Sequence, residues 1–216
     1  RKGSLSLSFV PMLAGSAFGA GVTMINGTLT ASVGSNALTV ALKTLAGADP
    51  SATDPVYVLF RSATAATGDY TVLTVTAATS VVVSSGSTLG TANAVPNRVW
   101  IVGFNDASTF RLGVINCRVG GSTPTQIVSL NEYELKSSTA EGGAGAADSA
   151  GVFYTGAAVT TKAFRVLGYV ESTQATAGTW ATAPSLIQLF GPGVRLPGLV
   201  VQTVQATTAS ITNNST

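Results

Sequence analysis

Apolar and polar residues alternate with a period of two along most of this chain, and this pattern restricts the fold more than any other feature of the sequence. Alternation of this kind sends successive side chains to opposite faces of a β-strand. The periodicity of amphipathic helices is nearly absent. The segments that predict strands are 4–10, 28–33, 38–45, 56–61, 70–76, 80–84, 98–104, 109–117, 126–130, 152–154, 162–172 and 199–205.

Turn-forming residues separate these segments. A Gly-Ser-Asn sequence lies at 34–36, and Asp-Pro pairs lie at 49–50 and 54–55. Residues 105–108 (Asn-Asp-Ala-Ser) predict a hairpin with a four-residue loop. Many short strands punctuated by glycine and proline predict an all-β chain with a β-sandwich or jelly-roll-like domain. The alternative is an intertwined trimeric β-structure in which neighbouring subunits cover the edge strands.

The charge content is unusually low. Only 9% of the residues are charged and 45% are hydrophobic, whereas a soluble domain has about 25% charged residues. The many β-branched residues argue against an intrinsically disordered chain. So few charges leave strand edges poorly protected against pairing with other chains. The composition therefore favours a trimeric assembly in which subunits bury part of their surface against one another.

The chain divides into three regions, and because it begins at Arg1 we expect it to be a piece of a longer protein. Residues 1–26 are predicted to be an extended N-terminal arm, 27–198 a β-sandwich-like domain, and 199–216 a strand and linker toward a distal region. The arm contains an apolar run, but Pro11 and several glycines interrupt it, so we expect no membrane insertion. Residues 141–151 (EGGAGAADSAG) are predicted to be a glycine-rich loop.

Histidine is absent from the chain. Its absence excludes Ser-His-Asp and Cys-His constellations and removes the commonest metal ligand. The single cysteine, Cys117, alternates with polar residues and is expected to be a small buried hydrophobe. The net charge is +2 and the basic residues are scattered, so nucleic-acid binding is not expected. We therefore predict no enzyme, no cofactor and no metal site.

Paired carboxylates could still support glycoside cleavage. Glu132 and Glu134 would point to the same face if residues 131–136 formed a strand. Such pairs arise easily by chance, so this signal is weak. The other candidate acids are Asp69, Asp106, Glu141, Asp148 and Glu171.

Two aromatic residues are candidates for contact with a partner. Trp180 lies in a loop-like sequence (AGTWATAP) and is predicted to be a subunit-interface anchor or a platform for a glycan. Tyr154, beside the glycine-rich loop, is the second candidate. Trp100 shares its parity with Val102 and Phe104, which indicates a core position.

Several short sequence segments occur in a characteristic order along the chain. They are NGTLTASV (26–33), LKTLAGADPS (42–51), AATGDY (65–70), FRLGVINC (110–117), STAEGGAGAADS (138–149), ATAGTW (175–180) and QLFGPGVRLPG (188–198). Over roughly residues 26–200 the chain resembles a family of tailed-bacteriophage and prophage fibre proteins. The resemblance implies a structural virion protein made in the bacterial cytoplasm: a homotrimeric fibre or spike component, attached to the tail or capsid. It carries over no catalytic motif.

Two other functions remain open from the sequence. One is a module that binds a host-surface glycan through loops carrying Trp180, Tyr154 or residues 141–151. The other is a polysaccharide depolymerase. In either case the expected partners are further copies of the chain and other virion proteins.

Overall fold

The computed structural model describes residues 23–62, 70–119, 126–141 and 148–190. Every regular element in these ranges is a β-strand, as the alternation predicts. The strands are β1 (Met24–Ile25), β2 (Gly27–Gly34), β3 (Ala37–Thr44), β4 (Val56–Arg61), β5 (Tyr70–Val75), β6 (Thr79–Val83), β7 (Asn97–Asp106), β8 (Thr109–Ile115), β9 (Arg118–Val119), β10 (Gln126–Ile127), β11 (Thr139–Ala140), β12 (Tyr154–Thr155), β13 (Phe164–Ser172) and β14 (Leu186–Leu189).

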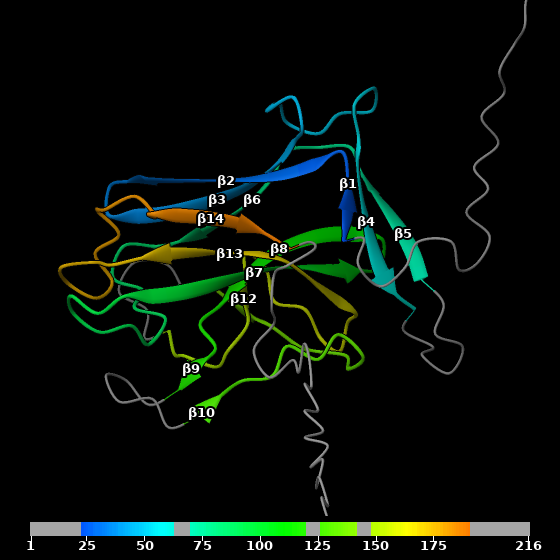
Figure 1. Ribbon diagram of the computed structural model, residues 1–216. Coiled ribbons are helices and arrows are strands. Elements are labelled where there is room, and N and C mark those ends of the chain that lie inside the picture. Colours follow the sequence, from blue (N-terminus) through cyan, green and yellow to red (C-terminus); the bar gives the residue numbers. More distant parts are fainter. Residues whose placement is uncertain (1–22, 63–69, 120–125, 142–147, 191–216) are drawn as a thin grey trace, which may run out of the picture.

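The largest sheet forms the middle layer of the molecule (Figure 1). Its strand order is β11-β12-β8-β7-β13-β14. A sheet of order β2-β3-β6 lies above it, and a sheet of order β1-β4-β5 stands at one end. The β9–β10 pair lies below. The chain is thus all-β with several sheets, an arrangement consistent with a β-sandwich.

Two tight hairpins define the strand register. Ser35 and Asn36 join β2 to β3 with φ angles of 50° and 61°, and Ala107 and Ser108 join β7 to β8 with φ angles of 50° and 71°. Two-residue loops with positive φ at both positions match the right-handed twist of the flanking strands. The predicted four-residue loop at 105–108 is therefore wrong, because its first two residues extend β7 and pair with β8.

The central sheet separates two hydrophobic clusters. In β7, Val99 and Ile101 pack into the main core against the other two sheets. Trp100 and Phe104 face the opposite side and join a second cluster. Loop residues from the lower layer complete that cluster, and Phe153 contacts Phe104 edge-on with ring centroids 5.7 Å apart. Both faces of this sheet are therefore buried.

A β-bulge in β13 changes which side chains face each cluster. The pairing with β7 shifts between Val166 and Gly168. Val166 consequently belongs to the second cluster whereas Val170, four residues later, enters the main core. The backbone of β14 passes so close to Gly168 that a Cβ atom there would overlap the carbonyl oxygen of Gln188.

The predicted arm is too long at its C-terminal end. Residues 23–26 belong to the β domain, since β1 pairs with β4 in the register Met24↔Val58 and Ile25↔Tyr57. The remainder of the arm, the predicted strands at 4–10 and 199–205 and the linker lie outside the described residues. The short strands β1, β9, β11 and β14 were not predicted.

Candidate functional site

Trp180 lies in the main core, so its predicted role as an exposed platform or interface anchor is wrong. Its side chain is 0% exposed. The indole Nε1–H donates to the carbonyl oxygen of Ser87 at 2.8 Å, and the Trp180 backbone N–H donates to the carbonyl oxygen of Asn36 at 3.1 Å. The segment that carries Trp180 forms no strand, yet it closes one end of the sandwich.

Tyr154 is also buried and cannot contact a glycan or a partner in this conformation. It lies in β12, and 5% of the residue is exposed. Its hydroxyl oxygen accepts a hydrogen bond from the backbone N–H of Ser149 at 2.8 Å. The side chain therefore fixes the segment that follows the glycine-rich stretch.

Glu132 and Glu134 diverge, so the same-face pair is wrong as well. Residues 131–134 form a turn that is closed by the Glu134 N–H donating to the Asn131 carbonyl oxygen at 3.1 Å. Glu132 points inward and accepts hydrogen bonds from the Arg165 guanidinium at 2.9 Å and the Val166 N–H at 2.6 Å. Burial raises the pKa of Glu132, although Arg165 opposes this effect. Glu134 points outward, and its hydrogen bond with Lys136 lowers its pKa.

Two further acids are held by cations on the surface. Asp106 lies 3.4 Å from Arg111 and 3.6 Å from Lys162, and Glu171 is hydrogen-bonded by Arg98. Such pairs at a solvated surface contribute little to stability. Asp69 lies outside the described residues.

Glu141 and Asp148 are the acids that the structure brings together. Glu141 accepts from the backbone N–H and the hydroxyl of Ser84 at 2.8 and 2.7 Å, and Asp148 accepts from the Ser87 hydroxyl. Burial raises the pKa of Asp148, the Ser87 hydrogen bond lowers it, and the neighbouring Glu141 raises it. These contacts tie both flanks of residues 142–147 to the segment after β6.

The remaining sequence candidates occupy core positions. Cys117 is 3% exposed, and burial raises the pKa of its thiol to about 12, so the predicted buried hydrophobe is confirmed. Trp100, 2% exposed, is a core residue as predicted. Within the described ranges, no three potential ligands among Cys, Asp and Glu are grouped as a metal ion would require. No helix in that part of the chain is long and apolar enough to cross a membrane.

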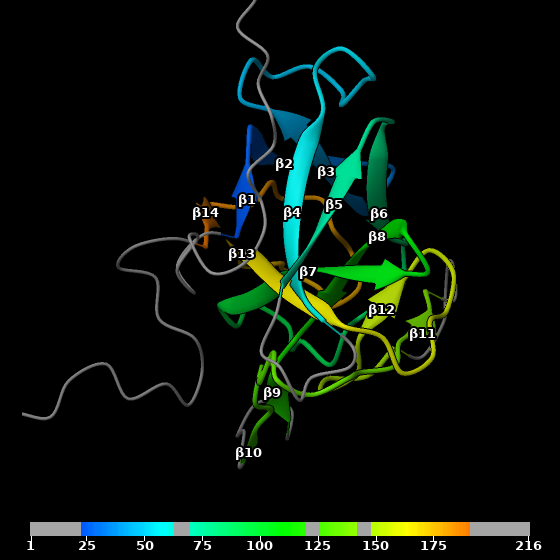
Figure 2. The ribbon, with the colours of Figure 1, turned by 90° about the vertical axis from the view of Figure 1, so that its right-hand side faces the viewer.

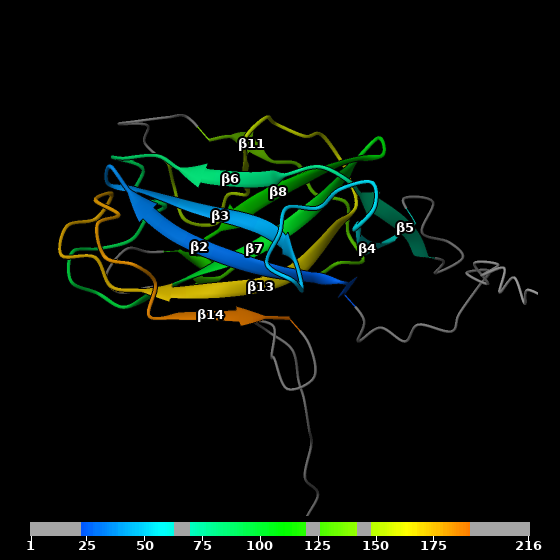
Figure 3. The ribbon, with the colours of Figure 1, turned by 90° about the horizontal axis from the view of Figure 1, so that it is seen from above.

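Strand β14 forms one edge of the central sheet. It pairs with β13 in the register Gly168↔Leu189 to Glu171↔Leu186, and no described strand pairs with its other side. Leu186 and Ile187 are each 38% exposed. Figure 3 shows β14 at the margin of the molecule. We call this strand the β14 edge.

The two ends of the described domain meet beside the β14 edge. The Thr23 hydroxyl donates to the carbonyl oxygen of Phe190 at 3.4 Å, and the Phe190 N–H donates to the Leu167 carbonyl oxygen at 2.6 Å. Figures 2 and 3 place β1 and β14 on the same side of the molecule. Ile25 on β1 and Tyr57 on β4 are also partly exposed, so exposed apolar side chains lie near the contact between Thr23 and Phe190.

A groove of about 350 Å³ lies at another end of the sandwich, where the end of β4, the start of β5 and the tip of the β7–β8 hairpin meet. We call it the hairpin groove. It is lined by the cations Arg61 and Lys162, the hydroxyl residues Ser62, Thr71 and Ser108, the amide residue Asn105, and Ala107 and Ala163. Figure 2 shows the strands that form this end.

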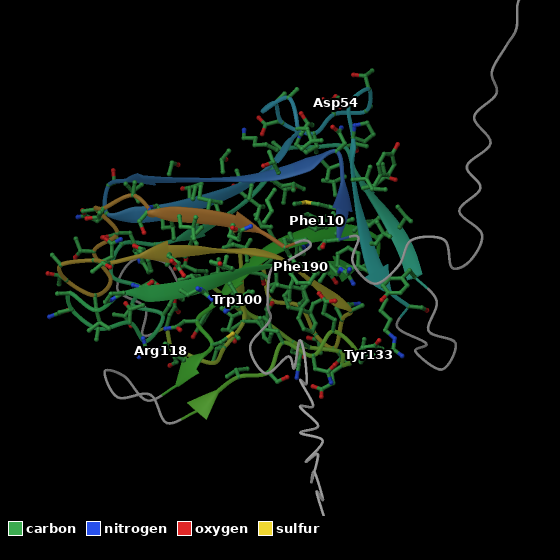
Figure 4. The ribbon with its side chains drawn as sticks, in the orientation of Figure 1. Asp54, Trp100, Phe110, Arg118, Tyr133 and Phe190 are labelled. Atoms are coloured by element: carbon green, nitrogen blue, oxygen red, sulfur yellow. The ribbon has the colours of Figure 1, made fainter. Side chains whose placement is uncertain are left out.

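Tyr133 stands beside the hairpin groove and is 68% exposed. The Arg61 guanidinium lies over its ring, 4.1 Å from the ring centroid. In Figure 4 the tyrosine lies beyond the lower end of β4, while Asp54 lies at the upper end. The groove thus combines fixed positive charge with an exposed aromatic ring.

The sequence patterns predict neither the hairpin groove nor the exposed position of Tyr133. The spacing of Glu132 and Glu134 predicted two carboxylates on one face of a strand. The exposed aromatic residue, Tyr133, lies between them in the sequence. Comparison with protein-family models, curated proteins and solved structures found no match to this chain.

Proposed function

We propose that this chain is a structural protein of a tailed-bacteriophage virion, a homotrimeric fibre or spike component that supports host attachment. Its partners are further copies of itself and other virion proteins of the tail or capsid, and its role is non-catalytic. The ordered phrases in the sequence and the all-β fold support this function. The observation that carries it is the meeting of Thr23 and Phe190 beside the β14 edge.

The β14 edge carries neither the charge nor the proline that protects many edge strands. Its sequence, Leu-Ile-Gln-Leu, has no charged residue and no proline. An exposed edge with these properties is a template for pairing with another chain. A neighbouring copy is the partner that best matches a chain whose surface is poor in charge. We propose that subunits meet along this edge.

The position of the domain ends bears on the shape of the assembly. Because Thr23 and Phe190 lie together on one side of the β domain, we propose that this side faces the axis of the fibre. In this arrangement the three β14 edges face the axis, and the hairpin groove is left for solvent.

Light scattering coupled to size exclusion tests the assembly. At micromolar concentration we expect a mass three times that of the 21.6 kDa chain. Ile187→Lys puts a charge on the β14 edge and should yield a folded monomer. Leu45→Lys is the matched control, because Leu45 is 70% exposed and lies beyond the end of β3, outside the β14 edge. A monomeric wild type, or a trimer that tolerates Ile187→Lys, contradicts the proposal.

A further inference from the structure

We propose that the hairpin groove binds a sugar that carries a carboxylate, such as a uronic acid unit of a glycan. This inference goes beyond the structural role and does not depend on it. It rests on the charge of the groove, its hydrogen-bonding groups, its rigidity and its size.

The charge of the groove favours an anion. Arg61 and Lys162 line it, and the other lining residues among those that the structure describes are uncharged. Lys162 is paired with Asp106, whose carboxylate lies 3.6 Å from the Lys162 ammonium and 3.4 Å from Arg111. A contact of 3.6 Å is a loose pair, so Lys162 can turn toward a ligand carboxylate at little cost.

The orientation of Arg61 suits a planar anion. Its guanidinium is stacked over Tyr133 at 4.1 Å from the ring centroid, which restricts the rotation of the group. A fixed guanidinium can donate two parallel hydrogen bonds to one carboxylate. A second tyrosine, Tyr70, is 39% exposed and faces Arg61 across the β4–β5 pairing. The anion-binding end of the groove therefore lies beside exposed aromatic rings.

The other lining groups suit a polyhydroxylated ligand. The hydroxyls of Ser62, Thr71 and Ser108 can each donate and accept hydrogen bonds, as the hydroxyl groups of a sugar require. Asn105 uses its Oδ1 to accept from the Ser108 N–H at 3.0 Å, which orients its amide hydrogens. The methyl groups of Ala107 and Ala163 offer an apolar contact to the C–H face of a sugar ring.

The β7–β8 wall of the groove is preorganised, and the groove is of suitable size. The β7–β8 turn fixes the hairpin tip, and the Asn105 N–H donates to the Ala163 carbonyl oxygen at 3.0 Å, which joins the two walls. A rigid site loses less freedom on binding a ligand. The volume of about 350 Å³ accepts a substituted sugar ring, whereas an inorganic phosphate would leave most of it unfilled.

Two-dimensional amide NMR of the full chain tests this assignment. Titration with glucuronate and galacturonate should give saturable shifts at the amides of Thr71, Asn105 and Ser108. Glucose and galactose, which have the same rings without the carboxylate, should bind at least about fivefold more weakly. Inorganic phosphate is titrated separately as a simple anion.

Paired lysine variants assign the binding to the groove. Lys162→Gln should weaken uronate binding by about fivefold. Lys136→Gln is the matched control, because Lys136 lies directly across an isolated β-bridge from Lys162 but pairs with Glu134 outside the groove. It should leave the affinity unchanged. The dispersion of the amide spectrum verifies that each variant is folded.

Four results would overturn the proposal. They are the absence of saturable shifts with either uronate, equal affinity for the neutral sugars, phosphate binding as tight as uronate binding, and an unchanged affinity in Lys162→Gln. None of these results bears on the oligomeric mass, so the sugar site and the structural role can fail independently.

Discussion

Trp180 joins a segment without secondary structure to the main core. Its indole ring is fully buried and its Nε1–H is paired with the Ser87 carbonyl oxygen. The sequence around it is rich in small and polar residues, which is typical of an exposed loop. Burial of such a loop depends on the tertiary contacts it makes, and local sequence does not encode them.

Substitution of Trp180 should therefore affect stability. Trp180→Ala should lower the free energy of unfolding by about 3–5 kcal/mol, because it leaves a large cavity. Trp180→Phe should cost less, about 1–3 kcal/mol, through the smaller ring and the unpaired Ser87 carbonyl oxygen. Chemical denaturation followed by circular dichroism measures both values. Unchanged stability in Trp180→Ala would show that the residue is outside the core.

Asp148 should make stability dependent on pH. Its pKa is raised in the folded chain by burial and by Glu141, above an ordinary value of 3.8. The folded state therefore holds this proton more tightly than the unfolded state, and stability falls as pH rises from 3.8 through the folded pKa. Asp148→Asn should remove this part of the pH dependence. Parallel stability curves for the two proteins between about pH 3.5 and 7 would contradict this assignment.

Cys117 should be inert in the folded protein. Burial raises its pKa to about 12, so very little of the thiol is ionised at neutral pH, and 3% of the residue is exposed. A thiol-specific disulfide reagent at pH 8 should label the chain only after guanidinium is added. Rapid labelling without denaturant would show that the second cluster opens readily.

At the scale of elements, long strands are the part of the fold that the sequence predicts well. Alternation extends over enough residues in β2 and β3 to reveal the buried face. Strands such as β1 and β11 have two residues each, too few to show a period. Their pairing is decided by the neighbouring strands.

The β13 bulge shows a second reason why sequence alternation does not predict every strand face. Alternation holds on each side of the bulge, but the parity differs between Val166 and Val170, so a single period assigns half of the strand to the wrong face. Glu132 reaches the part of β13 that β14 leaves uncovered and accepts the N–H of Val166 there. The sequence around Glu132 does not predict this contact, because the N–H group that binds its carboxylate belongs to a strand that is distant along the chain.

Gly168→Ala should detach β14 from the sheet. The added Cβ atom would overlap backbone atoms of Gln188, which cannot rotate away as a side chain would. We expect faster hydrogen exchange at the amides of β14 and a loss of about 1–3 kcal/mol in the free energy of unfolding. Gly34→Ala is the control, since a Cβ atom there meets nothing within 4 Å. Equal exchange rates in the two variants would contradict the close approach of β13 and β14.

For the whole molecule, the structure shows where the apolar and the polar side chains of this weakly charged chain lie. Most of the buried apolar side chains in the described part of the chain fall into two clusters on opposite faces of the central sheet. Leu186 and Ile187 on the β14 edge, and Ile25 on β1, are among the exposed apolar side chains, and we propose that subunits meet there. The hairpin groove, in contrast, gathers polar and cationic side chains. We therefore propose different partners for the two surfaces, another copy of the chain for the β14 edge and a sugar for the hairpin groove.

The position and copy number of this domain in intact phage particles test the central proposal most directly. Cryo-electron microscopy of purified particles should show three copies of the β domain around the axis of a fibre or spike, with the β14 edges toward that axis. Peptide mass spectrometry of the same preparation should find the chain in a multiple of three. Its absence from purified particles, or single isolated domains without threefold arrangement, would contradict the account.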